Sequence, residues 1–314
     1  MKIVSFLPGA TEMIYALGLG NQLVGVTHEC DFPVAATEKN IVVRNTIDMR
    51  DFTQEEIDTA VKKALHEGKS LYAVDEARLK EIAPDLILTQ DLCQVCAPSG
   101  NEVSHLLQHL PKKPEILWLR PSGLADIFEN LRQVGRATGQ EMAAKEYLLG
   151  LQNRVDVIKE KLSGLKTPSK VFFMEWLSPP YCGGHWVGEM IDIAGGYDPL
   201  AKKGTDSVRV SWEDILRAAP DVLILSPCGF NLEQTVAQVS LLSENPAWGN
   251  LPAVKNRRVY AVDANSYFAR PGPRVVDGIE LLAHLFHPEV FEWSGSEGAF
   301  MLVGFEGLPD KGAL

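Results

Sequence analysis

The chain has 314 residues, the length of about two ordinary domains. Its 46% hydrophobic and 23% charged residues are typical of a globular protein and exclude the disordered and fibrous classes. The 30 Lys and Arg against 41 Asp and Glu give a net charge of −11. That charge argues against binding to nucleic acid or anionic lipid, because no basic surplus offsets the phosphates.

The cysteine count and the first residues bear on the compartment. Five cysteines, an odd number in a chain this long, favour a reducing compartment or a chemical use of the thiols over a full set of disulfides. The first nine residues lack the apolar run and the cleavage site of a signal peptide. We therefore expect a cytoplasmic protein, or a periplasmic one if a leader has been removed.

Short apolar runs alternate with helical periodicity in the first third of the chain. Strands are expected over 3–7, 23–27, 86–89 and 116–119, and helices over 11–19, 54–67, 75–82 and 103–109. Strands that alternate with helices indicate βαβ units, so an α/β fold with a parallel sheet is predicted.

The middle of the chain predicts a long helical connector. Residues 124–162 keep helical periodicity, with a break only near 138–139. A helix of about 20 residues is about 30 Å long and stiff. The strand pattern then returns, with strands expected over 170–176, 222–226 and 258–262 and helices over 190–194, 212–218 and 275–286. We expect a first lobe at 1–122, a connecting helix at 123–166, a second lobe at 167–294 and an irregular tail at 295–314.

An internal repeat supports two related lobes. Residues 74–88 align with 210–224, and Ala-Pro-Asp recurs between helix and strand at 83–85 and 219–221. Glu12-Met13-Ile14 is echoed by Glu189-Met190-Ile191. A shared joint of this kind favours duplication over the general likeness of any two α/β units.

The loops that follow the strands collect the unusual residues. Ligands of parallel α/β sheets bind beyond the carboxyl ends of the strands. Aromatic side chains there suit a flat or apolar ligand, although they could also pack the lobes together. The candidate ligand-binding residues are Pro8, Gly9, Ala10, Thr11, His28, Glu29, Trp176, Tyr181, His185, Trp186, Phe230, Tyr267 and Arg270.

All five cysteines also fall in these loops, and they are the candidate metal ligands: Cys30, Cys93, Cys96, Cys182 and Cys228. The Cys93-x-x-Cys96 spacing can bind a soft metal or form a disulfide, whereas a cysteine can also serve as a small buried hydrophobe. No nucleophile elbow, phosphate-binding loop, dinucleotide fingerprint or paired-histidine zinc motif is present in the sequence. No catalytic residue is therefore assigned, and a thiol-dependent enzyme or metalloprotein is kept as the alternative.

The sequence resembles the helix-linked substrate-binding proteins of ABC importers for vitamin B12 and iron siderophores. The residues that carry the resemblance are 3–12 with 16–18, 23–27, 83–87, 246–248, 251–255, 259–260 and 270–274. The resemblance implies two Rossmann-like α/β lobes with parallel sheets, joined by a long helix, and a ligand cleft between the lobes. It also implies a non-catalytic function with a cobalamin-like corrinoid as the ligand, one face of which Trp186 would cover.

Two features depart from the family pattern. Importer proteins present one acidic residue per lobe to the permease; Glu213 matches in the second lobe, but Ala77 takes the corresponding position in the first. The sequence therefore predicts that the chain, in this form, does not serve a membrane importer. A ferric siderophore is the other candidate ligand, for which only Arg120, Arg270 and Arg274 offer positive charge near the predicted cleft.

Overall fold

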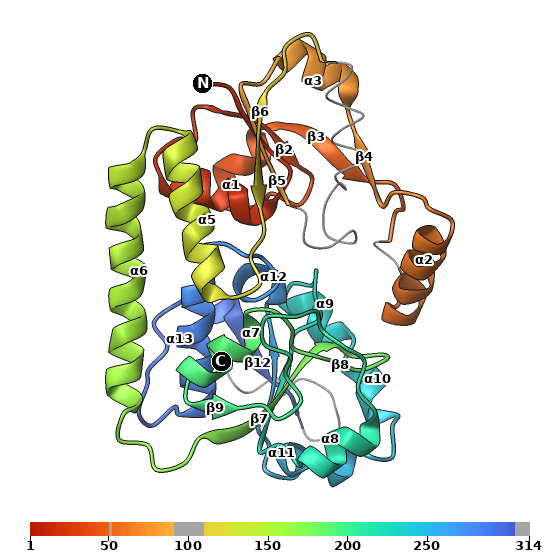
Figure 1. Ribbon diagram of the computed structural model, residues 1–314. Coiled ribbons are helices and arrows are strands. Elements are labelled where there is room, and N and C mark those ends of the chain that lie inside the picture. The colour runs from red at the N-terminus through yellow and green to blue at the C-terminus, as the bar shows by residue number, and fades with distance from the viewer. Residues whose placement is uncertain (50–51, 91–109, 305–314) are drawn as a thin grey trace. The chain divides into compact units, whose positions relative to one another are not determined.

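The computed structural model describes residues 1–49, 52–90 and 110–304, and it divides into two compact units (Figure 1). Unit 1 comprises Met1–Pro121, Ala125–Gly150 and Pro271–Pro273, and unit 2 comprises Ser122–Leu124, Leu151–Arg270 and Arg274–Leu314. Among the described residues, no helix has the length and apolar character needed to cross a membrane.

Unit 1 is built on a six-stranded sheet in the order β4-β3-β2-β1-β5-β6. The strands are β1 (Ile3–Ser5), β2 (Leu23–Thr27), β3 (Asn40–Asn45), β4 (Tyr72–Val74), β5 (Leu86–Gln90) and β6 (Glu115–Leu119). Neighbouring strands are parallel except at the edge, where β4 pairs antiparallel with β3. The predicted α/β fold with a parallel sheet is confirmed, and β3 and β4 are additions to the predicted strands.

The helices of unit 1 follow the predicted alternation. They are α1 (Pro8–Ala16), the 3-10 helix η1 (Val34–Glu38), α2 (Gln54–His66) and α3 (Glu76–Ile82). Helix α1 begins three residues earlier than predicted because Pro8 takes its first position, where the fixed φ of proline suits a helix and its missing N–H is no loss. Apolar side chains from several of these elements form one core cluster that includes Val4, Phe6, Leu79 and Ile87. The helix predicted over 103–109 lies outside the described residues.

Two helices stand where one connecting helix was expected. Helix α5 (Leu124–Ala137) and helix α6 (Glu141–Leu162) are separated by a turn in which Gly139 has φ +67°. They lie side by side in Figure 1, because Gly135 has no side chain and Ala144 therefore approaches its backbone closely. The break that the sequence showed near 138–139 is a reversal of the chain, so the connector is a helical hairpin.

Unit 2 has its own sheet in the order β12-β11-β10-β7-β8, with the short β9 also paired to β7. The strands are β7 (Ser169–Trp176), β8 (Tyr181–Cys182), β9 (Gly196–Tyr197), β10 (Val222–Leu225), β11 (Val259–Val262) and β12 (Phe300–Leu302). The central strands are parallel, whereas β8 and β12 pair antiparallel. The tail predicted to be irregular therefore contains an edge strand, β12.

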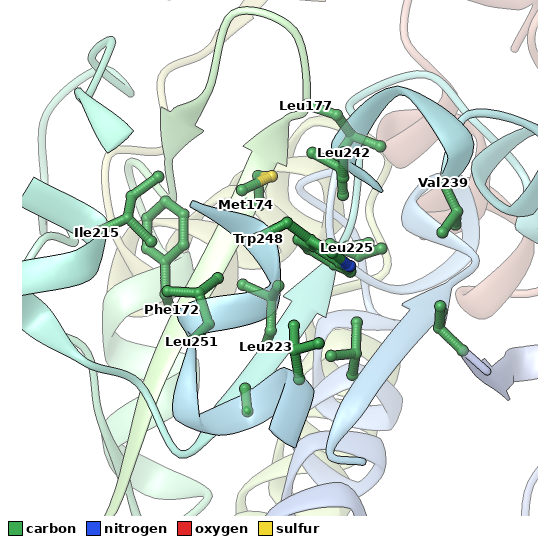
Figure 2. Packing of buried hydrophobic residues seen from close by; sticks show 14 of the residues in the cluster. Phe172, Met174, Leu177, Ile215, Leu223, Leu225, Val239, Leu242, Trp248 and Leu251 are labelled. Carbon is green, nitrogen blue, oxygen red and sulfur yellow. The ribbon is translucent and has the colours of Figure 1, made fainter. Parts of the chain in front are cut away.

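Both faces of this sheet are buried, as its near-continuous apolar strands require. On one face, Phe172, Met174, Leu223 and Leu225 pack around Trp248 (Figure 2). On the other face, Phe173 meets Phe268 edge to face, with ring centroids 5.2 Å apart. The helices of unit 2 are α7 (Val187–Ile193), α8 (Trp212–Ala218), α9 (Leu232–Ala237), α10 (Ser240–Ser243), α11 (Pro252–Lys255), α12 (Ala264–Tyr267) and α13 (Val275–Phe286).

The internal repeat is visible in backbone geometry. Helix α3 ends at Ala83 with φ 47° and ψ 66°, and α8 ends at Ala219 with φ 46° and ψ 62°. Left-handed alanine is uncommon, because its Cβ crowds the following carbonyl. The aspartate two residues later donates its backbone N–H over 2.8 Å in both units, from Asp85 to Lys2 O and from Asp221 to Lys170 O. One strained joint thus occurs at the same place in each unit, which supports duplication.

Candidate functional site

At the carboxyl ends of the unit 1 strands, the predicted site residues belong to α1 and to the turn after β2. Gly9, Ala10 and Thr11 are buried inside α1, so they form a helix rather than a loop. The Thr11 hydroxyl lies 3.1 Å from Cys30 Sγ, and both groups are buried. This contact ties the first turns of α1 to the segment that follows β2.

His28 and Glu29 of the same turn are partly exposed. His28 Nδ1 lies 3.3 Å from the Val43 carbonyl, and its Nε2 lies 3.9 Å from a Glu29 carboxylate oxygen. The Glu29 backbone N–H donates to the Thr27 hydroxyl over 3.0 Å. The contact with Val43 holds the His28 ring at the strand end, where a ligand of a parallel sheet is expected.

In unit 2, aromatic side chains gather at the end of β7. Trp176 is its last residue and meets Phe230 edge to face, with ring centroids 5.7 Å apart. Tyr181 pairs with Trp176 across the β7–β8 ladder. All three side chains are partly exposed. The Trp176 Nε1 is itself buried and has no hydrogen-bond acceptor among the residues that the structure describes.

Trp186 lies differently from Trp176. It is only 6% exposed, and its indole N–H donates to the Phe268 carbonyl over 2.8 Å. His185, just before it, has the left-handed φ of 48°, and its ring packs on Trp186. His185 Nε2 lies 3.0 Å from an oxygen of the exposed Asp206. The predicted contact of Trp186 with a ligand stays a prediction; in the structure this ring is packed, whereas Trp176 is the more exposed of the two indoles.

Glu175 is a candidate site residue that the sequence analysis missed. It precedes Trp176 at the end of β7, where the Gly184 backbone N–H donates to its carboxylate over 2.9 Å and the Ser207 hydroxyl also donates. Burial raises the pKa of Glu175 above its ordinary value, and the charge of Asp206 adds to the effect. The available signal was one acidic residue directly after the apolar run Val171–Met174.

Tyr267 and Arg270 are both partly buried. Tyr267 ends α12 and packs edge to face on Trp293, with ring centroids 5.9 Å apart. Burial raises the pKa of its hydroxyl, and the charges of Asp263 and Asp277 raise it further. The Tyr267 hydroxyl therefore stays protonated in neutral solution and can donate a hydrogen bond.

The five candidate metal ligands are only partly described. Cys93 and Cys96 lie outside the described residues, Cys30 and Cys182 are buried, and Cys228 is exposed. Burial raises the pKa of Cys182, which disfavours the thiolate form that binds metals. Within residues 1–49, 52–90 and 110–304, no three His, Cys, Asp or Glu side chains gather in a way that could hold a metal ion.

A surface hollow of about 640 Å³ in unit 2 lies away from these residues. Its lining includes Ser169 at the start of β7, Asp221 just before β10 and Arg258 just before β11. It therefore opens at the amino ends of the strands. It contains none of the predicted ligand-binding residues.

The two acidic docking positions can be compared through the repeat. The Asp75 side chain caps α3 and the Ser211 side chain caps α8, each by accepting the backbone N–H three residues on. Ala77 and Glu213 therefore stand at equivalent places, two residues after their caps. The predicted departure from the paired acids is present in the structure, and its effect on docking stays a prediction.

Comparisons with known proteins agree with this architecture. The family model described as "Periplasmic binding protein" matches residues 3–266. An uncharacterized ABC transporter substrate-binding lipoprotein, YvrC of Bacillus subtilis, is 25% identical over 93% of this chain and 81% of its own length. A vitamin B12-binding protein of Vibrio parahaemolyticus is 23% identical over 88% of this chain and 86% of its own.

Among solved structures, the periplasmic heme-binding protein RhuT of Roseiflexus, in its apo form, superposes with a TM-score of 0.67 at 21% identity, covering 92% of this chain and 98% of its own. The predicted cytoplasmic location finds no support in these relatives, whose names are those of a lipoprotein and a periplasmic protein. Because the family model spans most of the chain, the protein belongs to the periplasmic binding protein family, the substrate-binding proteins of ABC transporters.

Proposed function

We propose that the protein is a non-catalytic binding protein for a cobalamin-like corrinoid, contacted by residues at the carboxyl ends of the parallel strands. The observation that carries the proposal is the aromatic group at the end of β7, formed by Trp176, Tyr181 and Phe230. Partly exposed rings at this edge of a sheet suit the flat, largely apolar face of a macrocycle. The relative named as a vitamin B12-binding protein supports the same ligand class.

The charges beside these rings favour a corrinoid over the other ligand classes in the family. Glu175 and Asp206 place carboxyl groups next to the aromatic group. The positive charge of Lys202 lies close enough to Cys182 to lower the pKa of that thiol in part. Heme carries two carboxylates and many ferric siderophores are anionic, so both would meet the like charge of Asp206 here. A corrinoid presents neutral amide groups, which can accept from hydroxyl and indole donors and donate to a carboxylate.

Gel filtration tests this proposal directly. Purified protein is mixed in turn with cyanocobalamin, hemin and an anionic ferric siderophore, and the absorbance of each ligand is followed in the protein peak. We expect cyanocobalamin to co-elute with the protein at a ratio of one to one. Co-elution of the siderophore or hemin without cyanocobalamin would overturn the ligand assignment and leave the binding function standing.

The alternative, a thiol-dependent metalloprotein or enzyme, depends on Cys93 and Cys96. Cys182 does not support this alternative, because burial favours its protonated thiol over the thiolate that binds metals. Metal analysis of freshly purified protein and of a Cys93→Ser/Cys96→Ser variant tests it. Stoichiometric metal in the original chain that is lost in the variant would favour this alternative over a pure binding protein.

We further propose that the protein acts outside the cytoplasm, as the lipoprotein and periplasmic relatives do. Its net charge of −11 suits a partner with a basic surface, because long-range attraction speeds encounter. Permease docking would then rest on the exposed Glu213 of unit 2. Loss of transport in a Glu213→Ala variant that still binds ligand would support this route.

A further inference from the structure

Two glutamates that the repeat relates to each other lie against the segments by which the chain passes between the units. Glu12 in α1 is 4% exposed, and Glu189 occupies the first turn of α7. Each helix is the first one after the first strand of its unit. The aligned triplets Glu12-Met13-Ile14 and Glu189-Met190-Ile191 therefore have equivalent places in the fold.

In unit 1, Glu12 lies against the returning segment Pro271–Pro273, which is grouped with this unit. A Cβ on Gly272 would lie 3.1 Å from Glu12 Oε2 and 3.2 Å from the Gly9 Cα. A Cβ on Gly9 would in turn lie 2.7 Å from the Pro271 carbonyl oxygen. Two glycine backbones therefore meet directly beside the carboxylate, and a side chain on either would force them apart.

In unit 2, Glu189 lies against the outgoing segment Ser122–Leu124, which is grouped with that unit. The Leu124 backbone N–H donates to Glu189 Oε2 over 3.3 Å. A Cβ on Gly123 would lie only 2.4 Å from Glu189 Oε1. Here too a glycine lets a passing backbone approach a glutamate, and the glutamate binds the first N–H of the helix that follows.

The two passing segments also share their sequence. Arg120-Pro121 comes before the segment that meets Glu189, and Arg270-Pro271 comes at the start of the segment that meets Glu12. The first leads into α5 and the second into α13. In each unit, one glutamate thus contacts the segment that precedes a helix, and most of that helix is grouped with the other unit.

We propose that Glu12 and Glu189 are positioning residues that anchor the two chain passages and so fix the ligand-binding residues beside them. Glu12 follows Pro8–Thr11 in α1, and its carboxylate lies beside Gly272 in the segment that begins immediately after Arg270. Pro8–Thr11 and Arg270 belong to the predicted ligand-binding residues. The effect on ligand affinity rests on the proposed function, whereas the anchoring itself does not.

Hydrogen exchange of the unliganded protein tests the anchoring. Glu189→Ala removes the acceptor of the Leu124 N–H, so its exchange should become about tenfold faster, the scale of one lost hydrogen bond. Glu12→Ala should speed exchange in peptides that cover 270–275. The conservative Glu12→Gln and Glu189→Gln keep an oxygen acceptor and should restore most of the protection. Glu213→Ala, which removes an exposed carboxylate of the same unit as Glu189, is the matched control and should leave both segments unchanged.

Unchanged exchange in the alanine variants would overturn the anchoring, and so would an increase spread evenly over both units, which indicates a general loss of stability. Affinity for cyanocobalamin tests the second half of the proposal. Glu12→Ala should weaken binding about fivefold or more, with recovery in Glu12→Gln. Faster local exchange with unchanged affinity would refute the claim that Glu12 positions the ligand-binding residues. If the original chain does not bind cyanocobalamin, the proposed function is refuted, and the hydrogen-exchange result alone decides whether the glutamates anchor the two segments.

Discussion

Trp176 and Trp186 separate ligand contact from packing within one unit. Trp186 is 6% exposed and donates its indole N–H to Phe268, so Trp186→Ala leaves a large cavity and an unpaired carbonyl. We expect that change to lower the free energy of unfolding by about 3–5 kcal/mol. Trp176 is more exposed and meets Phe230 by one edge. Trp176→Ala should instead weaken cyanocobalamin binding by about 2 kcal/mol, the effect of an aromatic at the centre of an interface, which is about thirtyfold in Kd.

The assay pairs urea unfolding with equilibrium titration of cyanocobalamin for each variant. Trp186→Phe serves as a milder variant if Trp186→Ala does not fold, and Trp176→Phe keeps a ring while it removes an indole N–H that is buried without an acceptor among the described residues. Trp176→Phe should therefore unfold no more easily than the original chain. Affinity unchanged within twofold in Trp176→Ala, together with weaker binding by a fully stable Trp186→Phe, would refute the reasoning and restore Trp186 as the contact.

Three further predictions concern the helices, pH and location. Gly150 lies in the interior of α6, where an added Cβ meets no atom, so Gly150→Ala should raise the free energy of unfolding by up to about 1 kcal/mol. Gly139 has φ +67°, so Gly139→Ala should lower the free energy of unfolding by about 1 kcal/mol. Urea unfolding in which both variants change stability in the same direction would contradict this. Burial raises the pKa of Asp198 to about 6, although the backbone N–H groups of Phe173 and Leu200 donate to it. The stability that this carboxyl contributes is complete below its unfolded pKa and is lost as pH rises through about 6. The free energy of unfolding of the original chain, relative to that of Asp198→Asn, should therefore fall by on the order of 3 kcal/mol from pH 4 to pH 7. A difference that stays constant with pH would show that the pKa of Asp198 is not raised. Fractionation of the native host should recover the protein outside the cytosol, and recovery in the cytosol alone would restore the location predicted from the first residues.

Sequence periodicity predicted a strand that is buried throughout and helices whose apolar residues recur at helical spacing. Strand β10 (Val222–Leu225) is buried throughout, and α8 and α13 have the predicted bounds. Two of the missed strands, β4 and β12, are edge strands with little burial. The missed β3 lies inside its sheet, with Val42 and Val43 buried. β4 (Tyr72–Val74) and β12 (Phe300–Leu302) have three residues each, none of them fully buried, so neither is long enough to show the alternation that periodicity detects. The hairpin of α5 and α6 was hidden because both helices keep the same period on either side of Gly139.

The sequence predicted where in the fold the candidate site lies, but not what each of its residues does. The rule that ligands bind beyond the strand ends selected Trp176 and Trp186 together, because sequence cannot show which indole is packed. Glu175 was passed over as one residue of a mostly apolar strand, although it is a partly buried acid beside the aromatic group. The role of Glu12 and Glu189 depends on glycines more than 60 residues away in the chain, Gly272 and Gly123, so only the folded backbone shows it.

Calorimetric titration of the purified chain with cyanocobalamin tests the central claim most directly. The account predicts saturable binding at one corrinoid per chain, with affinity that falls in Trp176→Ala and is kept in Glu213→Ala. Absence of saturable heat with cyanocobalamin, while hemin or an anionic ferric siderophore saturates the same protein, would contradict the assignment of a corrinoid to the aromatic and acidic residues at the end of β7.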